Sequence, residues 1–239
     1  MTYEKRIVAF VDILGFKNAI KSTIKDGVPD LKRIKEIDLA LFEMARLMEI
    51  EPIEISSILF GKETPPSAIA TQFSDSLVAS LHSDDPAEVF RWLLKSLYWV
   101  PIQLMSMAGL TCRGGVTFGY ALHNESRLFG PAINSAYHLS EDKDKAIYPR
   151  IVIDPKVISM LDGGRGRIRE KEGLEIEDLL TRDKDGWYYI DYFKRIPNEG
   201  GAAEWDEYTQ RLNNVVSKHL QCTDSRLLKK YQWMRAKMT

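Results

Sequence analysis

Hydrophobic and polar positions follow two periods along the chain, and these predict an alternation of strands and helices. Residues 6–11 (RIVAFV) form a short apolar, β-branched run of the length of a buried strand. From about 30 to 50, apolar residues recur at spacings of three, four and seven, which is typical of a helix packed on a core. Residues 68–81 place two β-prone segments around Ser74-Asp75, which favours a tight hairpin.

The same pattern continues with a second helix and two more strands. Asp85-Pro86 opens a long helix, with an acceptor at the cap and proline at the first helical position. Residues 110–122 predict a glycine-containing strand, 131–141 a short helix and 148–154 another strand. The order strand, helix, hairpin, helix, strand, helix, strand indicates an α+β fold with a mixed sheet flanked by helices.

The pattern changes after residue 154. An aromatic strand is expected at 187–193 (WYYIDYF), and helical patterns occupy roughly 204–238. These 85 residues contain few aliphatic runs and would make a thin core alone. We therefore predict a core over residues 1–154 and a C-terminal extension over 155–239 that packs on it.

Composition and charge narrow the class of protein. The 239 residues carry 33 Lys+Arg against 34 Asp+Glu, a net charge of −1, which argues against a nucleic-acid-binding surface or a polybasic membrane anchor. No apolar run reaches the ~18 residues of a membrane span, and no cleavage site follows the N-terminal apolar stretch. Two cysteines, Cys112 and Cys222, are too few for a disulfide framework or a zinc site. A cytoplasmic protein is expected.

Two acids stand at the ends of predicted strands. Asp12 ends the first strand, and Asp75 lies at the tip of the hairpin. Two such carboxylates can converge at one edge of a sheet and hold two Mg²⁺ or Mn²⁺ ions, which bind a triphosphate. The alternatives are structural: Asp12 would cap the helix that follows, and Asp75 would favour the turn.

Other candidate residues have similar alternatives. The turn at Gly15-Phe16 could offer backbone amides to phosphate, or only connect a strand to a helix. Arg113 could bind phosphate or pair with an acid. Asn134 and His138, four apart, share a helix face that would meet a sugar or phosphate, or solvent. The five cations between 226 and 237 predict a solvated helix face.

Four segments in order resemble the class III nucleotide cyclases: FVDILGF at 10–16, FSDSLV at 73–78, CRGGVTFG at 112–119 and FGPAINSAYHLSE at 129–141. The resemblance spans roughly residues 6–154. It implies a ferredoxin-like β-α-β-β-α-β core, and a homodimer with active sites at the subunit interface.

The resemblance also implies roles for single residues. Two metal ions, Mg²⁺ or Mn²⁺, would be held by the carboxylates of Asp12 and Asp75 and the carbonyl of Ile13. Gly15 and Phe16 would offer amides to the phosphates, which Arg113 would grip. Asn134 of the partner subunit would steady the ribose.

The chain departs from the family pattern at several positions. Ser74 stands where glycine is usual, Thr71 where adenylate cyclases carry a base-reading lysine, and Arg127 where they carry a base-reading acid. Without that lysine and acid the adenine edge loses its matched donor and acceptor, which argues against ATP. His138 replaces the arginine expected to stabilise the transition state, and Lys184 or Lys145 is the candidate substitute.

The compact form, the FVDILGF segment and the tail KKYQWMRAKM at 229–238 are similar to the pyrimidine cyclases of bacterial Pycsar anti-phage systems. That similarity implies conversion of UTP or CTP to cyclic UMP or cyclic CMP, which activates a separate effector. Three other functions stay open: a purine cyclase with an unusual base pocket, a cyclase-like domain that binds nucleotide or a partner without turnover, and a two-metal phosphohydrolase.

Overall fold

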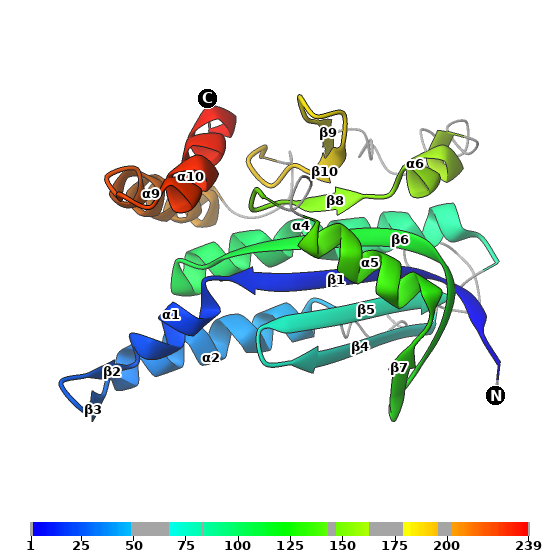
Figure 1. Cartoon of the computed structure of the whole chain (residues 1–239), viewed down its shortest axis with the longest axis horizontal. Helices are drawn as coiled ribbons and strands as arrows, with labels where there is room; N and C mark the ends of the chain where they lie inside the picture. The colour runs from blue at the N-terminus through cyan, green and yellow to red at the C-terminus, as the bar shows by residue number, and fades with distance from the viewer. Residues whose placement is uncertain are drawn as a thin grey trace.

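The computed structural model describes residues 2–48, 67–82, 84–142, 147–162, 179–195 and 202–238 (Figure 1). Its strands are β1 Glu4–Leu14, β2 Ile24–Lys25, β3 Val28–Pro29, β4 Ser67–Phe73, β5 Ser76–His82, β6 Thr111–Asn124, β7 Arg127–Phe129, β8 Ile151–Ile153, β9 Leu180–Arg182 and β10 Tyr188–Ile190. Its helices are α1 Phe16–Lys21, α2 Leu31–Arg46, α4 Pro86–Ala108, α5 Pro131–Glu141, α6 Pro155–Asp162, α9 Ala202–His219 and α10 Ser225–Lys237. Among these segments, no helix is both long and apolar enough to cross a membrane.

The main sheet has the strand order β4-β5-β1-β6-β8-β10-β9, and β7 pairs with β6. The pairs β4–β5, β5–β1 and β1–β6 are antiparallel, whereas β6–β8 is parallel, so the sheet is mixed. The strands β1, β4, β5 and β6 occupy the positions of a ferredoxin-like β-α-β-β-α-β unit, with β1 between β5 and β6, whereas β2 and β3 form a separate two-stranded sheet. The predicted α+β fold with a mixed sheet flanked by helices is therefore confirmed.

Helices cover both faces of β1. Ile7, Val11 and Ile13 belong to the large core that includes α2 and α4, whereas Val8 and Phe10 pack against α5. Successive strand residues point to opposite faces, so burial on both faces explains why this strand is a continuous apolar run. Figure 1 shows α5 across one face of β6 and β1, with α4 behind the sheet. The side that carries α5 is called the α5 face below.

Glycine in β6 lets α5 approach the sheet closely. A Cβ at Gly115 would lie 2.4 Å from Cβ of Leu139 and 2.7 Å from the carbonyl oxygen of Ala136. No side chain larger than hydrogen fits there without a shift. This contact fixes the height of α5 above the sheet and the position of Glu141 at its end.

The C-terminal residues continue the sheet. β10 pairs with β8, and the large core includes Tyr189, Tyr208 and Trp233. Trp233 stacks on Tyr148 with ring centroids 5.2 Å apart. The division at residue 154 stays a prediction.

The aromatic strand expected over 187–193 is shorter than predicted. It ends at Ile190, because the side-chain Oδ1 of Asp191 accepts the backbone N–H of Phe193 at 3.3 Å and turns the chain.

Candidate functional site

The end of β1 and the tip of the β4–β5 hairpin meet, and this contact brings Asp12 and Asp75 together. Asp12 pairs with Ser76 of β5 on one side and Arg113 of β6 on the other. The backbone N–H of Ile13 donates to the carbonyl oxygen of Asp75 at 2.9 Å. Two acids that are 63 residues apart in the sequence therefore lie at the same end of the sheet, where β1 meets the turn of the hairpin.

The carboxylate of Asp12 is largely shielded from solvent, but it accepts hydrogen bonds from neighbouring side chains. Its side chain is 16% exposed; Ser76 Oγ donates to Oδ1 at 3.3 Å, and Arg113 Nε donates to Oδ2 at 3.1 Å. Burial raises the pKa of Asp12, the charges of Asp75 and Glu141 raise it further, and Arg113 opposes both. A cation at this position would relieve the repulsion between the acids.

The structural alternative for Asp12 does not hold. The N-cap of α1 is Gly15, with φ +75°, and its carbonyl oxygen accepts from the N–H groups of Asn18 and Ala19. No atom lies within 4 Å of a Cβ built on Gly15, so conformation rather than space favours glycine there. Phe16 packs on the large core.

Ser74 in the hairpin turn has a φ of +57°, in the left-handed region. This is the position where the resemblance expects glycine, and the backbone geometry explains that expectation. Serine keeps the turn, and with it the position of Asp75, at a conformational cost.

Arg113 forms ion pairs with two acidic side chains in this structure. Besides Asp12, its Nη2 donates to Oε1 of Glu141 at the end of α5. The guanidinium therefore links β1, β6 and α5, and neutralises part of the acidic cluster. Binding of phosphate by Arg113 stays a prediction.

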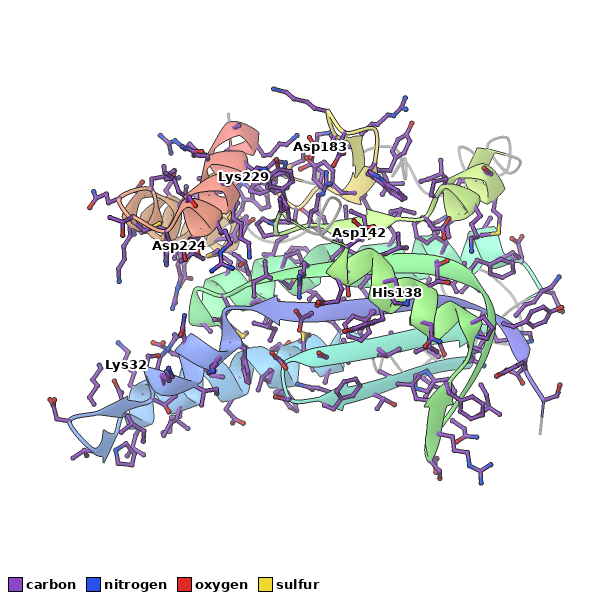
Figure 2. All side chains as sticks on the ribbon, in the orientation of Figure 1. Lys32, His138, Asp142, Asp183, Asp224 and Lys229 are labelled. Atoms are coloured by element: carbon purple, nitrogen blue, oxygen red, sulfur yellow. The ribbon has the colours of Figure 1, made fainter. Side chains whose placement is uncertain are left out.

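The structure leaves three candidate residues on exposed surfaces. Asn134 and His138 lie on the exposed side of α5, and Figure 2 labels His138 on this helix. Glu141 follows His138 by one turn. Arg127 is exposed on β7, where its backbone N–H donates to Asn124 Oδ1 at 2.9 Å. The side chains of Asn134 and His138 are therefore accessible on the surface of the chain.

Thr71, at the predicted base-reading position, contacts a buried histidine. Its Oγ1 lies 2.9 Å from Nε2 of His123, whose Nδ1 lies 2.8 Å from Oγ of Ser80. Burial lowers the pKa of His123 to about 4, with a further contribution from the charge of Arg6. Sequence reasoning did not find His123, because its partners lie on strands 43 and 52 residues away.

Helix α10 adds a cation whose charge interacts with Asp12. Lys230 of α10 is half-buried; burial lowers its pKa, Arg113 and Arg226 lower it further, and Asp12 is among the charges that oppose this shift. The predicted solvated helix face is wrong for Lys230 and for Lys237, whose Nζ lies 2.9 Å from Asp183 Oδ1. Of the other candidate cations, Lys184 is exposed in the β9–β10 turn, and Lys145 lies outside the described residues.

The donor set at this edge suits a hard divalent cation. The described part of the chain holds no group of three or more metal-ligating side chains. The carboxylates of Asp12 and Asp75 and the carbonyl of Ile13 are oxygen ligands, as Mg²⁺ prefers. Mg²⁺ commonly takes one or two carboxylates and completes its shell with substrate phosphates and water.

Comparisons with known proteins give solved structures only. No family model and no curated protein matches the chain. A monomeric guanylyl cyclase domain of the RhoGC fusion protein from Blastocladiella emersonii is 13% identical with a TM-score of 0.47, covering 80% of this chain and 96% of its own. An adenylate/guanylate cyclase/hydrolase from Silicibacter pomeroyi is 13% identical with a TM-score of 0.43, covering 80% and 98%. A class III adenylyl cyclase-like ATP-binding protein from Pseudomonas aeruginosa is 12% identical with a TM-score of 0.41, covering 98% and 44%. Any function assigned to the chain therefore rests on its own residues.

Proposed function

We propose that this chain is a pyrimidine nucleotide cyclase, which converts UTP or CTP to 3′,5′-cyclic UMP or cyclic CMP and pyrophosphate. The observation that carries the proposal is the junction of β1 with the β4–β5 hairpin, where Asp12 and Asp75 lie together beside Arg113. The order of the four cyclase-like segments supports it.

The carboxylates of Asp12 and Asp75 and the Ile13 carbonyl would hold two Mg²⁺ or Mn²⁺ ions. When bound, such ions polarise the ribose 3′-hydroxyl and neutralise the triphosphate. Arg113 opposes the rise that burial causes in the pKa of Asp12. Its guanidinium would bind the phosphates.

Positive charge and backbone donors would stabilise the phosphates during in-line attack. We assign this role to the amides of Gly15 and Phe16, to Arg113 and to Lys230. Lys230 would supply positive charge in the role that the resemblance assigns to an arginine at position 138. It is favoured over Lys184 because its charge interacts with Asp12 and Arg113.

The complete site would form between two copies of the chain. Asn134 of the partner subunit would steady the ribose, with His138 one turn away on the same exposed face of α5. Thr71 and Arg127 would meet the base. An aromatic side chain exposed on this helix, Tyr137 at 44%, supports a homodimer, since such residues are enriched in the cores of interfaces.

The cyclic product would act in the cytoplasm as a second messenger in anti-phage defence, by activating a separate effector. The support for this role is the FVDILGF segment and the KKYQWMRAKM tail. No nucleic acid or membrane is needed for it.

The test is to incubate the purified chain with an equimolar mixture of the four NTPs and Mg²⁺ or Mn²⁺, and to identify products by mass spectrometry. We expect cyclic UMP or cyclic CMP, and loss of all cyclic product in Asp12→Ala and Asp75→Ala with little unfolding. Asp38→Asn, at an exposed acid on α2, is the matched control and should retain activity.

Other outcomes identify other functions. A folded Asp12→Ala, Asp75→Ala double variant that still cyclises contradicts the metal assignment. Nucleoside monophosphate or inorganic phosphate indicates a phosphohydrolase. Thermal stabilisation by nucleotide without pyrophosphate release indicates a binding domain without turnover, which the engagement of Arg113 by Asp12 and Glu141 favours as the second candidate.

A further inference from the structure

A chain of polar side chains runs across the α5 face, from β1 through β5 and the far end of β6 to β4. Arg6 Nε donates to Ser80 Oγ at 2.8 Å, and Arg6 Nη2 donates to the Ser80 carbonyl at 3.2 Å. Ser80 Oγ lies 2.8 Å from His123 Nδ1, and His123 Nε2 lies 2.9 Å from Thr71 Oγ1. Arg6, Ser80 and His123 are 2%, 0% and 5% exposed.

The hydrogen bond from Arg6 to Ser80 determines which atom donates and which accepts in the other hydrogen bonds. A guanidinium can only donate, so Ser80 Oγ accepts from Arg6 and keeps its own proton to give. Within the described part of the chain, the partner that can take this proton is Nδ1 of His123. The positive charge of Arg6 also favours the tautomer whose lone pair lies on the Ser80 side.

Burial and the charge of Arg6 keep the His123 ring neutral, since they lower its pKa to about 4. A neutral ring that accepts at Nδ1 carries its proton on Nε2. That N–H donates to Thr71 Oγ1. The hydroxyl proton of Thr71 is therefore not used toward His123 and is free to be donated elsewhere.

The position of Thr71 relative to Asp12 suits contact with a nucleotide base. Thr71 pairs with Val78, which pairs with Phe10, and Asp12 lies two residues beyond Phe10 on the same face. Two strand spacings across and two residues along separate Thr71 from Asp12 by roughly 12 Å. Phe73, 49% exposed, lies on the same face of β4 in the row of Asp12 and offers an aromatic surface.

We infer that Arg6, Ser80 and His123 fix Thr71 as a hydrogen-bond donor, and that this donor selects UTP over CTP. The exocyclic O4 of uracil accepts a hydrogen bond, whereas the N4 amine of cytosine donates, so the free proton of Thr71 matches uracil, and cytosine can use only the one lone pair of Oγ1 that His123 leaves. His123 is thus a positioning residue that acts through Thr71. The inference rests on the proposed function, in which Thr71 meets the base.

The experiment compares kcat/KM for UTP and CTP in the full chain and in four variants. The wild type should favour UTP by about tenfold or more, because a mismatched donor leaves a polar group unpaired. Thr71→Val should bring the ratio to within about threefold of one, and Thr71→Ser, which keeps the hydroxyl, should preserve it. His123→Leu should lower the ratio in the wild-type background and have no further effect when combined with Thr71→Val.

A second measurement does not depend on activity or on the folding of the His123 variant. The ¹⁵N shifts of the His123 ring should show Nε2 protonated and Nδ1 unprotonated at pH 7. The opposite tautomer, a preference for CTP, or an unchanged ratio in Thr71→Val overturns the inference. Cyclic product without a UTP preference overturns the inference but not the proposed function. Nucleotide binding that favours UTP over CTP without cyclic product overturns the proposed function but not the inference.

Discussion

Ser74 has an unfavourable backbone conformation at the candidate site. A residue with a Cβ at φ +57° carries strain of order 1 kcal/mol that glycine avoids. Ser74→Gly should therefore raise the free energy of unfolding by about 1 kcal/mol, measured in denaturant. Ser74→Ala keeps the Cβ and should gain nothing. Equal stabilisation by both substitutions would show that the turn conformation is not the cause.

His123 makes folding sensitive to mild acid. Its pKa is lowered from 6.5 to about 4, so between these values the unfolded chain binds a proton that the folded chain does not. Stability should fall as the pH decreases through this window, by about 3 kcal/mol in total, and this loss should level off below pH 4. Unfolding in denaturant at a series of pH values measures the slope, and His123→Gln should reduce it. An unchanged slope in that variant would assign the effect to other groups.

At the scale of elements, the packing of α5 on β6 positions Glu141 and the exposed face that carries Asn134. Gly115→Ala places a methyl 2.4 Å from Cβ of Leu139, and overpacking of this kind costs about 1–3 kcal/mol. Gly119→Ala is the matched control, because its Cβ would meet Ala132 Cβ at 3.4 Å. Thermal unfolding should show a clear loss for Gly115→Ala and a small change for Gly119→Ala. Similar losses would contradict the close approach of α5 at Gly115.

The elements themselves could be predicted because their periodicity is local. The hairpin at 68–81, the helix at 131–141 and the alternation of strands and helices along the chain follow from spacings that a short window contains. The contact between His123 and Thr71 could not be predicted, since it depends on how the far end of β6 lies against β4. Asp191 shortened the aromatic strand through a side-chain hydrogen bond that β-propensity does not include.

For the whole molecule, β9 and β10 continue the sheet that β1 and β6 build, and Lys230 of α10 interacts electrostatically with Asp12. Lys230→Met should lower kcat about tenfold through lost charge stabilisation, with little change in thermal stability. Lys230→Arg should retain most of the activity. Lys229→Met, at the exposed neighbour labelled in Figure 2, is the control. Equal activity in the Lys229 and Lys230 variants would contradict the role proposed for Lys230.

The sequence could not reveal Lys230 because α10 carries cations on several faces. Lys229, Lys230 and Lys237 have the same residue type but differ in exposure and in neighbouring charges. Only packing distinguishes them: Trp233 and Met234 are buried, which fixes the rotation of the helix. Asp12 and Asp75 could be predicted from the sequence, since each lies beside an apolar, β-prone segment.

The central place of β1 has a consequence for synthesis on the ribosome. Asp12 and its β6 partner Arg113 are 101 residues apart, so β1 is made long before the strand that completes its pairing. At ~5–20 residues per second, that interval lasts roughly 5–20 s. During this interval, the apolar segment from Ile7 to Ile13 has at least one strand edge without a hydrogen-bonded neighbour. Both of its faces carry apolar side chains that are buried in the folded protein. The nascent chain is therefore exposed to aggregation, and to capture by chaperones, until Thr111–Asn124 emerges.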